Sequence, residues 1–311
     1  MFNYTLRRLL WLIPTLLAMA LVTFLVMHAT PGSPLDPVAE GANPLSPEAQ
    51  QNLAAAYGLD KPLWEQFGIF VSKALQGDFG QSFAYRRPAM EVVLERLPAT
   101  LELSAAALLI ALTIAIPAGI ISAVKRNSVF DHLSMGVVLL GQSVPTFWLG
   151  MLMILVFAVV LHALPVSGRG SFAQLVLPSV TLAMWLLALV ARLTRSGMLE
   201  VLSQDYIRTA RAKGLAEVAV TTRHAVRNAL VPIVTVVGLQ VGGLLGGAVM
   251  TEAVFAWPGV GTLVLESILK RDYPVVLAAL IIVAAAFVLI NLMVDLLCGY
   301  LDPRVRTERR G

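Results

Sequence analysis

The polar interval from Asp205 to Pro232 holds the side chains best placed to do chemistry. It carries five cations against two acids, namely Arg208, Arg211, Lys213, Arg223 and Arg227 with Asp205 and Glu217. Apolar runs long enough to cross a bilayer flank the interval on both sides. A cationic loop between two membrane spans is expected on the cytoplasmic side. The chemistry that this loop offers is electrostatic recognition of a cytoplasmic partner.

The interval reads as two short helices separated by a glycine. Asp205 stands where a negative charge favours the positive end of a helix dipole. Gly214 follows the basic residues and marks a common helix end, and a second helix is expected to resume near Ala216 and lead to Pro232. A compact helix–Gly–helix of this kind is suited to contacting another protein.

No residue set in the chain resembles a site for bond-making chemistry. The phosphate-binding pattern G-x-x-x-x-G-K-[ST] is absent, as are H-E-x-x-H and G-x-S-x-G. The chain has one cysteine and four scattered histidines without metal-ligand spacing. We therefore expect no catalytic residues, no metal site and no cofactor bound by this chain. A membrane enzyme is the least favoured reading.

The composition indicates a polytopic, all-α membrane protein. Hydrophobic residues make up 58% of the 311 residues and charged residues only 14%, against roughly a quarter in soluble domains. Six transmembrane helices are predicted at residues 9–29, 101–124, 133–164, 175–191, 229–250 and 275–300. The basic residues lie at span ends, which argues against nucleic acid as a partner. The positions of the basic clusters place both termini in the cytoplasm.

The predicted organisation has four parts. Residues 1–30 form the N-terminal tail and first span, and residues 31–96 form an external segment of three helices. Residues 97–300 form the core, with the basic loop at 203–228, and residues 301–311 form a cytoplasmic tail. In the external segment Ser46, Pro62 and Pro88 are expected to begin the helices.

The third span is too long for one straight crossing. Its polar interruption includes Gln142, Ser143 and Pro145. An irregular backbone at membrane depth is tolerated only where it faces protein or a water-filled cavity. These residues are therefore candidates for the translocation path.

Small and polar residues in the last two spans form a second candidate group. Gly238, Gly242 and Gly246 recur every four residues, so this face can approach another helix closely. It serves either a subunit interface, the transport path or packing within the chain. Gln240 and Asn291 are amides inside spans, and Asp295 is an acid within two turns of an inner end. Asp295 is more consistent with a structural salt bridge to a loop arginine than with transport.

The basic loop resembles the coupling loop of ABC-importer permeases. The general pattern of that loop is Glu-Ala-Ala-x-x-x-Gly, and Arg208, Thr209 and Ala210 stand here in place of Glu-Ala-Ala. The longer strings YIRTARAKG and RHAVRNALVP are similar to the dipeptide/oligopeptide/nickel branch, which shows the same departure. Further strings support the resemblance from Arg7 to Arg306, among them GDFGQSF, PTFWLG, GLQVGGLLGGAVMTEAVFAWPGVG and VDLLCGYLDPRVR.

The resemblance implies a type I ABC-importer permease fold and a coupling helix that contacts the ATPases. The residues so implied are Ile207, Arg208, Thr209, Ala210, Arg211, Ala212, Lys213, Gly214 and Leu215. Supporting positions in the same loop are Arg223, His224, Arg227 and Asn228.

The resemblance also implies partners and a class of cargo. The chain would be the B-type permease in a heterodimer with a second, homologous permease. Two cytoplasmic ATPases would bind ATP and magnesium, and an extracytoplasmic binding protein would deliver cargo to a transporter in the cytoplasmic (inner) membrane. Short peptides are the expected cargo, with nickel chelates and glutathione as alternatives. A secondary transporter is the rival of another class, and it would depend on Asp295 as its ionisable residue.

Overall fold

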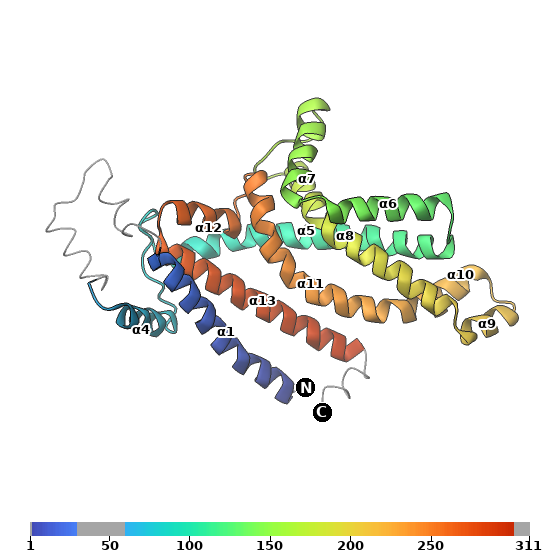
Figure 1. The fold of residues 1–311 in the computed structure, drawn as a ribbon, viewed down its shortest axis with the longest axis horizontal. Coiled ribbons are helices and arrows are strands. Elements are labelled where there is room, and N and C mark those ends of the chain that lie inside the picture. The colour runs from blue at the N-terminus through green and yellow to red at the C-terminus, as the bar shows by residue number, and fades with distance from the viewer. Residues whose placement is uncertain (1, 30–59, 302–311) are drawn as a thin grey trace. The chain divides into compact units, whose positions relative to one another are not determined.

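The computed structural model describes residues 2–29 and 60–301, and these residues are mostly helical (Figure 1). The α-helices are α1 (Phe2–Ala29), α4 (Leu63–Ala74), α5 (Ala89–Val124), α6 (Val129–Ser143), α7 (Thr146–Met153), α8 (Phe172–Leu202), α9 (Asp205–Ala212), α10 (Glu217–Ala219), α11 (Arg227–Val254), α12 (Val260–Leu269) and α13 (Tyr273–Leu301). Two π-helices, η1 (Ile154–Val160) and η2 (Val220–Val226), follow α7 and α10. The external helix expected from Ser46 lies outside the described residues.

The described helices include several that are long and apolar enough to cross a membrane. Four pass this test singly: α5, α8, the part of α11 from Pro232 to Val254, and the part of α13 from Tyr273 to Val294. The pair α6 and α7–η1 passes together as a span bent by 111°. In α1 the apolar stretch is the shorter Ile13–Val26. The all-α membrane class is confirmed, whereas the count of six spans stays a prediction.

Helix α5 differs from the prediction. The third external helix, expected to begin at Pro88, does not end before the second span; α5 runs without a break for 36 residues. Its buried side chains recur at helical spacing on both sides of the expected boundary, at Ala89, Val93, Thr100, Leu103 and Ala107. One continuous buried stripe favours one helix over two. The short helix α12 was not predicted from the sequence at all.

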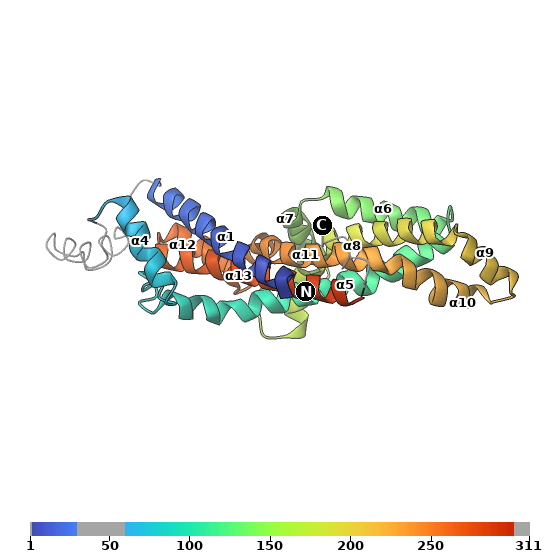
Figure 2. The same ribbon diagram turned by 90° about the horizontal axis from the view of Figure 1, so that it is seen from below.

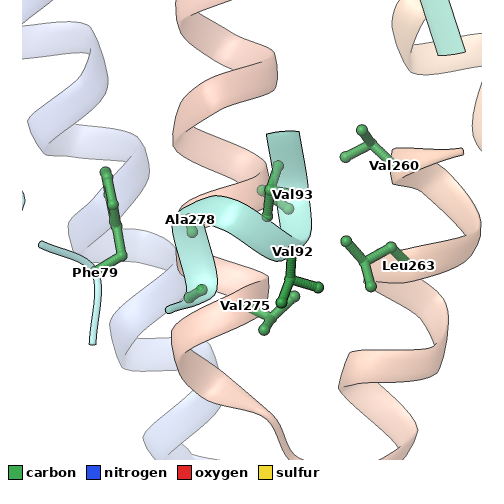
Figure 3. Packing of buried hydrophobic residues seen from close by; sticks show 9 residues of the cluster. Phe79, Val92, Val93, Val260, Leu263, Val275 and Ala278 are labelled. Carbon is green, nitrogen blue, oxygen red and sulfur yellow. The ribbon is translucent and has the colours of Figure 1, made fainter. Parts of the chain in front are cut away.

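The chain divides into two compact units, and the first comprises Met1–Thr100 and Pro258–Val288. Its core joins three helices and the segment before α5 (Figure 3). Val92 and Val93 of α5 lie near Val260 and Leu263 of α12, and Val275 and Ala278 of α13 lie beside them with Phe79.

Asp272 fixes the segment before α5 within this unit. Its carboxylate is fully buried and accepts hydrogen bonds from the Ser82 hydroxyl and from the backbone N–H groups of Phe83 and Ala84, the latter two at 3.1 Å. A buried carboxylate needs such donors because desolvation of its charge is costly. The two sequence-distant segments are therefore held together by one side chain.

The second unit comprises Leu101–Trp257 and Leu289–Gly311. In it α8 packs between α6 and α11, and α9 and α10 lie at the far ends of α8 and α11 (Figures 1 and 2). Gly119 allows α5 to approach α8 closely, because a Cβ atom at this position would lie 2.6 Å from Cβ of Thr194. The basic loop joins α8 to α11, so this packing determines where the loop lies within the unit.

Candidate functional site

Helix α9 is anchored by one apolar edge. Ile207 is fully buried and Ala210, one turn later, is 7% exposed. Both belong to a cluster whose other buried members are Ala123, Met198, Val220, Ala225 and Ala229. The cluster draws on α5, α8, η2 and α11, so α9 is fixed against the ends of the long helices. The predicted helix, from Asp205 to the residues before Gly214, is confirmed.

The turn after α9 is closed by hydrogen bonds around Gly214. This glycine has φ +78°, a conformation that an L side chain adopts only with strain. Its N–H donates to the Arg211 carbonyl at 2.9 Å, and the Leu215 N–H donates to the Ala210 carbonyl at 3.4 Å. The Arg211 Nε donates to Glu217 Oε1 at 2.6 Å, which ties α9 to α10 across the turn. The predicted glycine stop and the helix resuming after Ala216 are both confirmed.

The side of the loop opposite the buried edge of α9 is exposed and basic. Arg208, Thr209, Arg211, Ala212, Lys213, Gly214 and Leu215 are all exposed. Arg208 lies 3.5 Å from Asp205 in a pair that is almost fully solvated. Within the part of the chain that the structure describes, Lys213, Arg223 and Arg227 form no ion pair. Most of the loop's positive charge is therefore available to another molecule.

Of the four predicted support residues, Asn228 has a side-chain contact with α9. Its Nδ2 donates to the Tyr206 hydroxyl at 2.9 Å and to the His224 carbonyl at 3.1 Å. His224 is half-buried in η2, whereas the side chains of Arg223 and Arg227 are exposed. The side chain of Asn228 therefore links the start of α11 to α9 by a hydrogen bond.

A buried ion pair between α6 and α8 was not recognised from the sequence. Asp131 lies in the first turn of α6 and is 3% exposed. Arg195 of α8 donates to both of its oxygens, from Nε at 2.6 Å and from Nη2 at 2.8 Å. The Ser122 hydroxyl adds a bond of 2.6 Å, and the Asn127 N–H adds one of 2.9 Å. Four donors on one carboxylate hold α5, α6 and α8 in register.

The polar interruption of the third span forms a real break. Helix α6 ends at Ser143, α7 begins after Pro145, and the chain turns by 111° between them (Figure 1). Proline at this position removes an N–H donor and suits the first turn of a new helix. Gln142 accepts a hydrogen bond from Nη1 of Arg192 at 3.2 Å, and the Ser143 hydroxyl donates to the Leu139 carbonyl. The prediction that the third span is not one straight crossing is confirmed.

The glycines of α11 do not share one environment. A Cβ atom on Gly238 would lie 1.9 Å from Cγ1 of Val294, so this glycine packs against α13 within the chain. A Cβ atom on Gly246 would meet nothing within 4 Å among the described residues. Gly242 is buried. Packing within the chain is therefore the better interpretation for Gly238, while Gly246 is open to another surface.

The polar residues predicted inside the last two spans are also placed differently. Asn291 is half-buried, and its Oδ1 has no hydrogen-bond partner among the described residues. Gln240 is half-buried on α11. Asp295 lies in α13, but its side chain is outside the described set, so its predicted salt bridge stays a prediction.

Family models match almost the whole chain. The model described as "Binding-protein-dependent transport system inner membrane component" matches residues 115–307. The model of the corresponding N-terminal region matches residues 1–104.

Full-length relatives are named as permease proteins of dipeptide, di/tripeptide or glutathione transport systems. The dipeptide transport system permease protein DppB of Escherichia coli K12 is 42% identical over 99% of this chain and 100% of its own length. A di/tripeptide permease protein of Pseudomonas aeruginosa is 43% identical with the same coverage. The glutathione transport system permease protein GsiC of E. coli K12 is 44% identical over 98% of this chain and 99% of its own length.

One solved structure supports the fold. An inward-facing MetNI methionine ABC transporter chain superposes with a TM-score of 0.60 at 20% identity, over 68% of this chain and 97% of that one. At this identity the likeness speaks for the fold alone, which is that of a type I ABC permease.

Proposed function

The chain belongs to the family of inner membrane components of binding-protein-dependent transport systems, and from this premise we propose that it carries short peptides across the cytoplasmic membrane. As a permease subunit of an ABC importer it is a transport component and not a catalytic one. The names of the E. coli and P. aeruginosa relatives support di- and tripeptides as cargo.

The observation that carries the mechanism is the division of α9 into a buried edge and an exposed basic side. Ile207 and Ala210 fix α9 to the ends of α5, α8 and α11. Arg208 and Lys213 project from the other side without a buried counter-ion. A movement of an ATPase that binds these cations would therefore be passed to the long helices. This is the coupling role proposed for Ile207 to Leu215, with Arg223, His224, Arg227 and Asn228 in support.

The partners follow from the same proposal. The chain would pair with a second, homologous permease, and two cytoplasmic ATPases would bind ATP and Mg²⁺ and grip the loop at 203–228. A binding protein would deliver cargo at the outer face. Both termini would lie in the cytoplasm, in keeping with the basic residues at 7–8 and in the tail. The division into parts at 1–30, 31–96, 97–300 and 301–311 remains our working organisation.

The break at Ser143 is the proposed point at which α6 and α7 border the transport path. A 111° bend between apolar helices exposes backbone groups that lipid cannot satisfy, so the bend should face protein or water. Asn291, whose Oδ1 has no hydrogen-bond partner among the described residues, is a second polar position that we assign to the path.

Glutathione is the second candidate cargo, because the GsiC relative is 44% identical over nearly its full length. Nickel chelates remain the third. A self-sufficient secondary transporter is disfavoured by the family.

The test is ATP-driven uptake by the complete transporter in proteoliposomes, with alanyl-alanine as cargo. We expect R208Q/K213Q to lose most uptake and to retain less ATPase on purification. The matched control is K125Q/R126Q, which removes the same charge from exposed positions between α5 and α6. Uptake and ATPase binding at wild-type levels in R208Q/K213Q would show that α9 is not the coupling element.

A further inference from the structure

Two arginines on α8, three residues apart, have partners of different charge. Arg195 forms the buried, two-bond pair with Asp131. Arg192 is exposed, and its Nη1 donates to Gln142 Oε1, which belongs to a neutral amide. Among the side chains that the structure describes, no carboxylate pairs with Arg192. Its positive charge is therefore uncompensated within the described chain.

The position of Arg192 argues against contact with lipid. It directly follows the predicted span at 175–191 in α8, a helix long and apolar enough to cross a membrane, and a charge that faced hydrocarbon at this end would be costly. A lipid-facing arginine near the inner end of a span would extend toward the headgroups. The Arg192 side chain instead reaches toward the break, because Gln142 is the residue immediately before Ser143.

The packing of α6 against α8 places the Arg192–Gln142 contact beside the break. A Cβ atom on Gly141 would lie 3.1 Å from Cε of Met184 and 3.9 Å from Cβ of Ala188, so the end of α6 lies against α8 about one turn before Arg192. Ser143 is exposed at the same point. A guanidinium, an amide and a hydroxyl thus gather where the span is interrupted.

We propose that Arg192 and Gln142 form a subsite for the carboxylate of the cargo as it passes through the permease. A guanidinium carries five N–H donors in a planar fork that matches a carboxylate with two parallel bonds. Gln142 accepts one of these donors and offers its own NH₂ group to an anion. This inference rests on the proposed function, and it adds a chemical requirement: the cargo bears a free carboxylate.

Three substitutions separate this role from a structural one. R192Q removes the charge, and R192K keeps the charge but loses the fork. Q142E places a fixed carboxylate beside Arg192, so the subsite is already occupied. A structural contact would be strengthened by Q142E, whereas a cargo subsite would be blocked by it.

The experiment uses the complete reconstituted transporter at saturating, loaded binding protein. Uptake of alanyl-alanine is compared with uptake of its C-terminal amide, which lacks the carboxylate. We expect R192Q and Q142E to lower the maximal rate for alanyl-alanine about tenfold or more, as for loss of a charge-assisted hydrogen bond, and R192K to be intermediate. The rate for the amide should change little. R126Q removes one exposed charge elsewhere in the same unit and should behave as wild type.

Two results would overturn the proposal. One is uptake of alanyl-alanine by both R192Q and Q142E at the wild-type rate. The other is loss of the second permease from purified R192Q while Q142E takes up alanyl-alanine at the wild-type rate. This result would place Arg192 in a subunit interface. A wild-type complex that takes up no alanyl-alanine with ATP contradicts the peptide proposal instead. The same variants are then compared on glutathione, which also bears carboxylates.

Discussion

The ion pair of Asp131 and the charges of α9 lie in the same unit but differ in their exposure to water. The side chains of Asp131 and Arg195 are 4% and 26% exposed. Those of Asp205 and Arg208, which also lie within hydrogen-bond range, are 95% and 75% exposed. In the first pair the carboxylate is buried and the guanidinium is partly buried, whereas the second pair is almost entirely in water.

This difference separates two tasks. Removal of one partner from a buried pair leaves an unpaired charge in a poor solvent, and so the pair rigidly determines how its helices meet. An exposed pair contributes little, because water and salt already screen both charges. The structure therefore fixes the helix framework with Asp131 and leaves the α9 cations exposed to water. Substitutions in the two regions should separate stability from coupling.

The largest effect on stability is expected for D131A. It leaves the Arg195 guanidinium without its carboxylate and removes the acceptor for the Ser122 hydroxyl and the Asn127 N–H. We expect the free energy of unfolding to fall by about 3 kcal/mol. Thermal unfolding of the purified protein in detergent, followed by size-exclusion chromatography, measures the loss.

A double-mutant cycle with R195M checks that the pair is responsible. The loss in D131A/R195M should be smaller than the sum of the two single losses, because the double variant leaves no unpaired charge. S122A removes one hydrogen bond and should cost only about 1 kcal/mol. Strict additivity of D131A and R195M would argue against a coupled pair.

A smaller loss of stability, with a specific loss of coupling, is expected for I207A. Truncation of this buried side chain leaves a cavity beneath α9 at a cost of about 2 kcal/mol. The exposed cations would be retained, so the ATPases should still bind. We expect ATP hydrolysis to continue while uptake falls, since the anchor between α9 and the long helices is weakened. Peptide uptake and ATP hydrolysis are measured on the same proteoliposomes to give the number of peptides carried per ATP hydrolysed. An unchanged value in I207A would contradict the proposal that Ile207 anchors α9.

The sequence predicted those parts of the site that local signals determine. Asp205 and Gly214 mark the two ends of the α9 segment, and Pro145 marks the break, because each acts on the backbone next to it. The start of α4 after Pro62 was predicted for the same reason.

What the sequence did not reveal depends on contacts between distant residues. Asp131 and Arg195 are 64 positions apart, and the only local trace is the Ser128 cap that receives the Asp131 N–H. The regular spacing of Gly238 and Gly246 suggested one shared face, yet Gly238 packs against Val294, whereas a Cβ atom on Gly246 would meet nothing within 4 Å among the described residues. Spacing identifies a face of a helix, but it cannot identify what covers that face.

The smallest effect on stability is expected for the exposed pair on α9. D205N and R208Q should each change the free energy of unfolding by no more than about 0.5 kcal/mol, because the pair is solvated and its closest atoms are 3.5 Å apart. Their effects on transport should nevertheless differ. R208Q removes a cation that the proposal assigns to the ATPase contact, whereas D205N removes only an acid beside it, so uptake should fall in R208Q and hold or rise in D205N. Raising the salt concentration should weaken ATPase binding by the wild type more than by R208Q, since screening acts on the charge that R208Q lacks. Equal salt dependence in the two proteins would show that Arg208 does not face the ATPase.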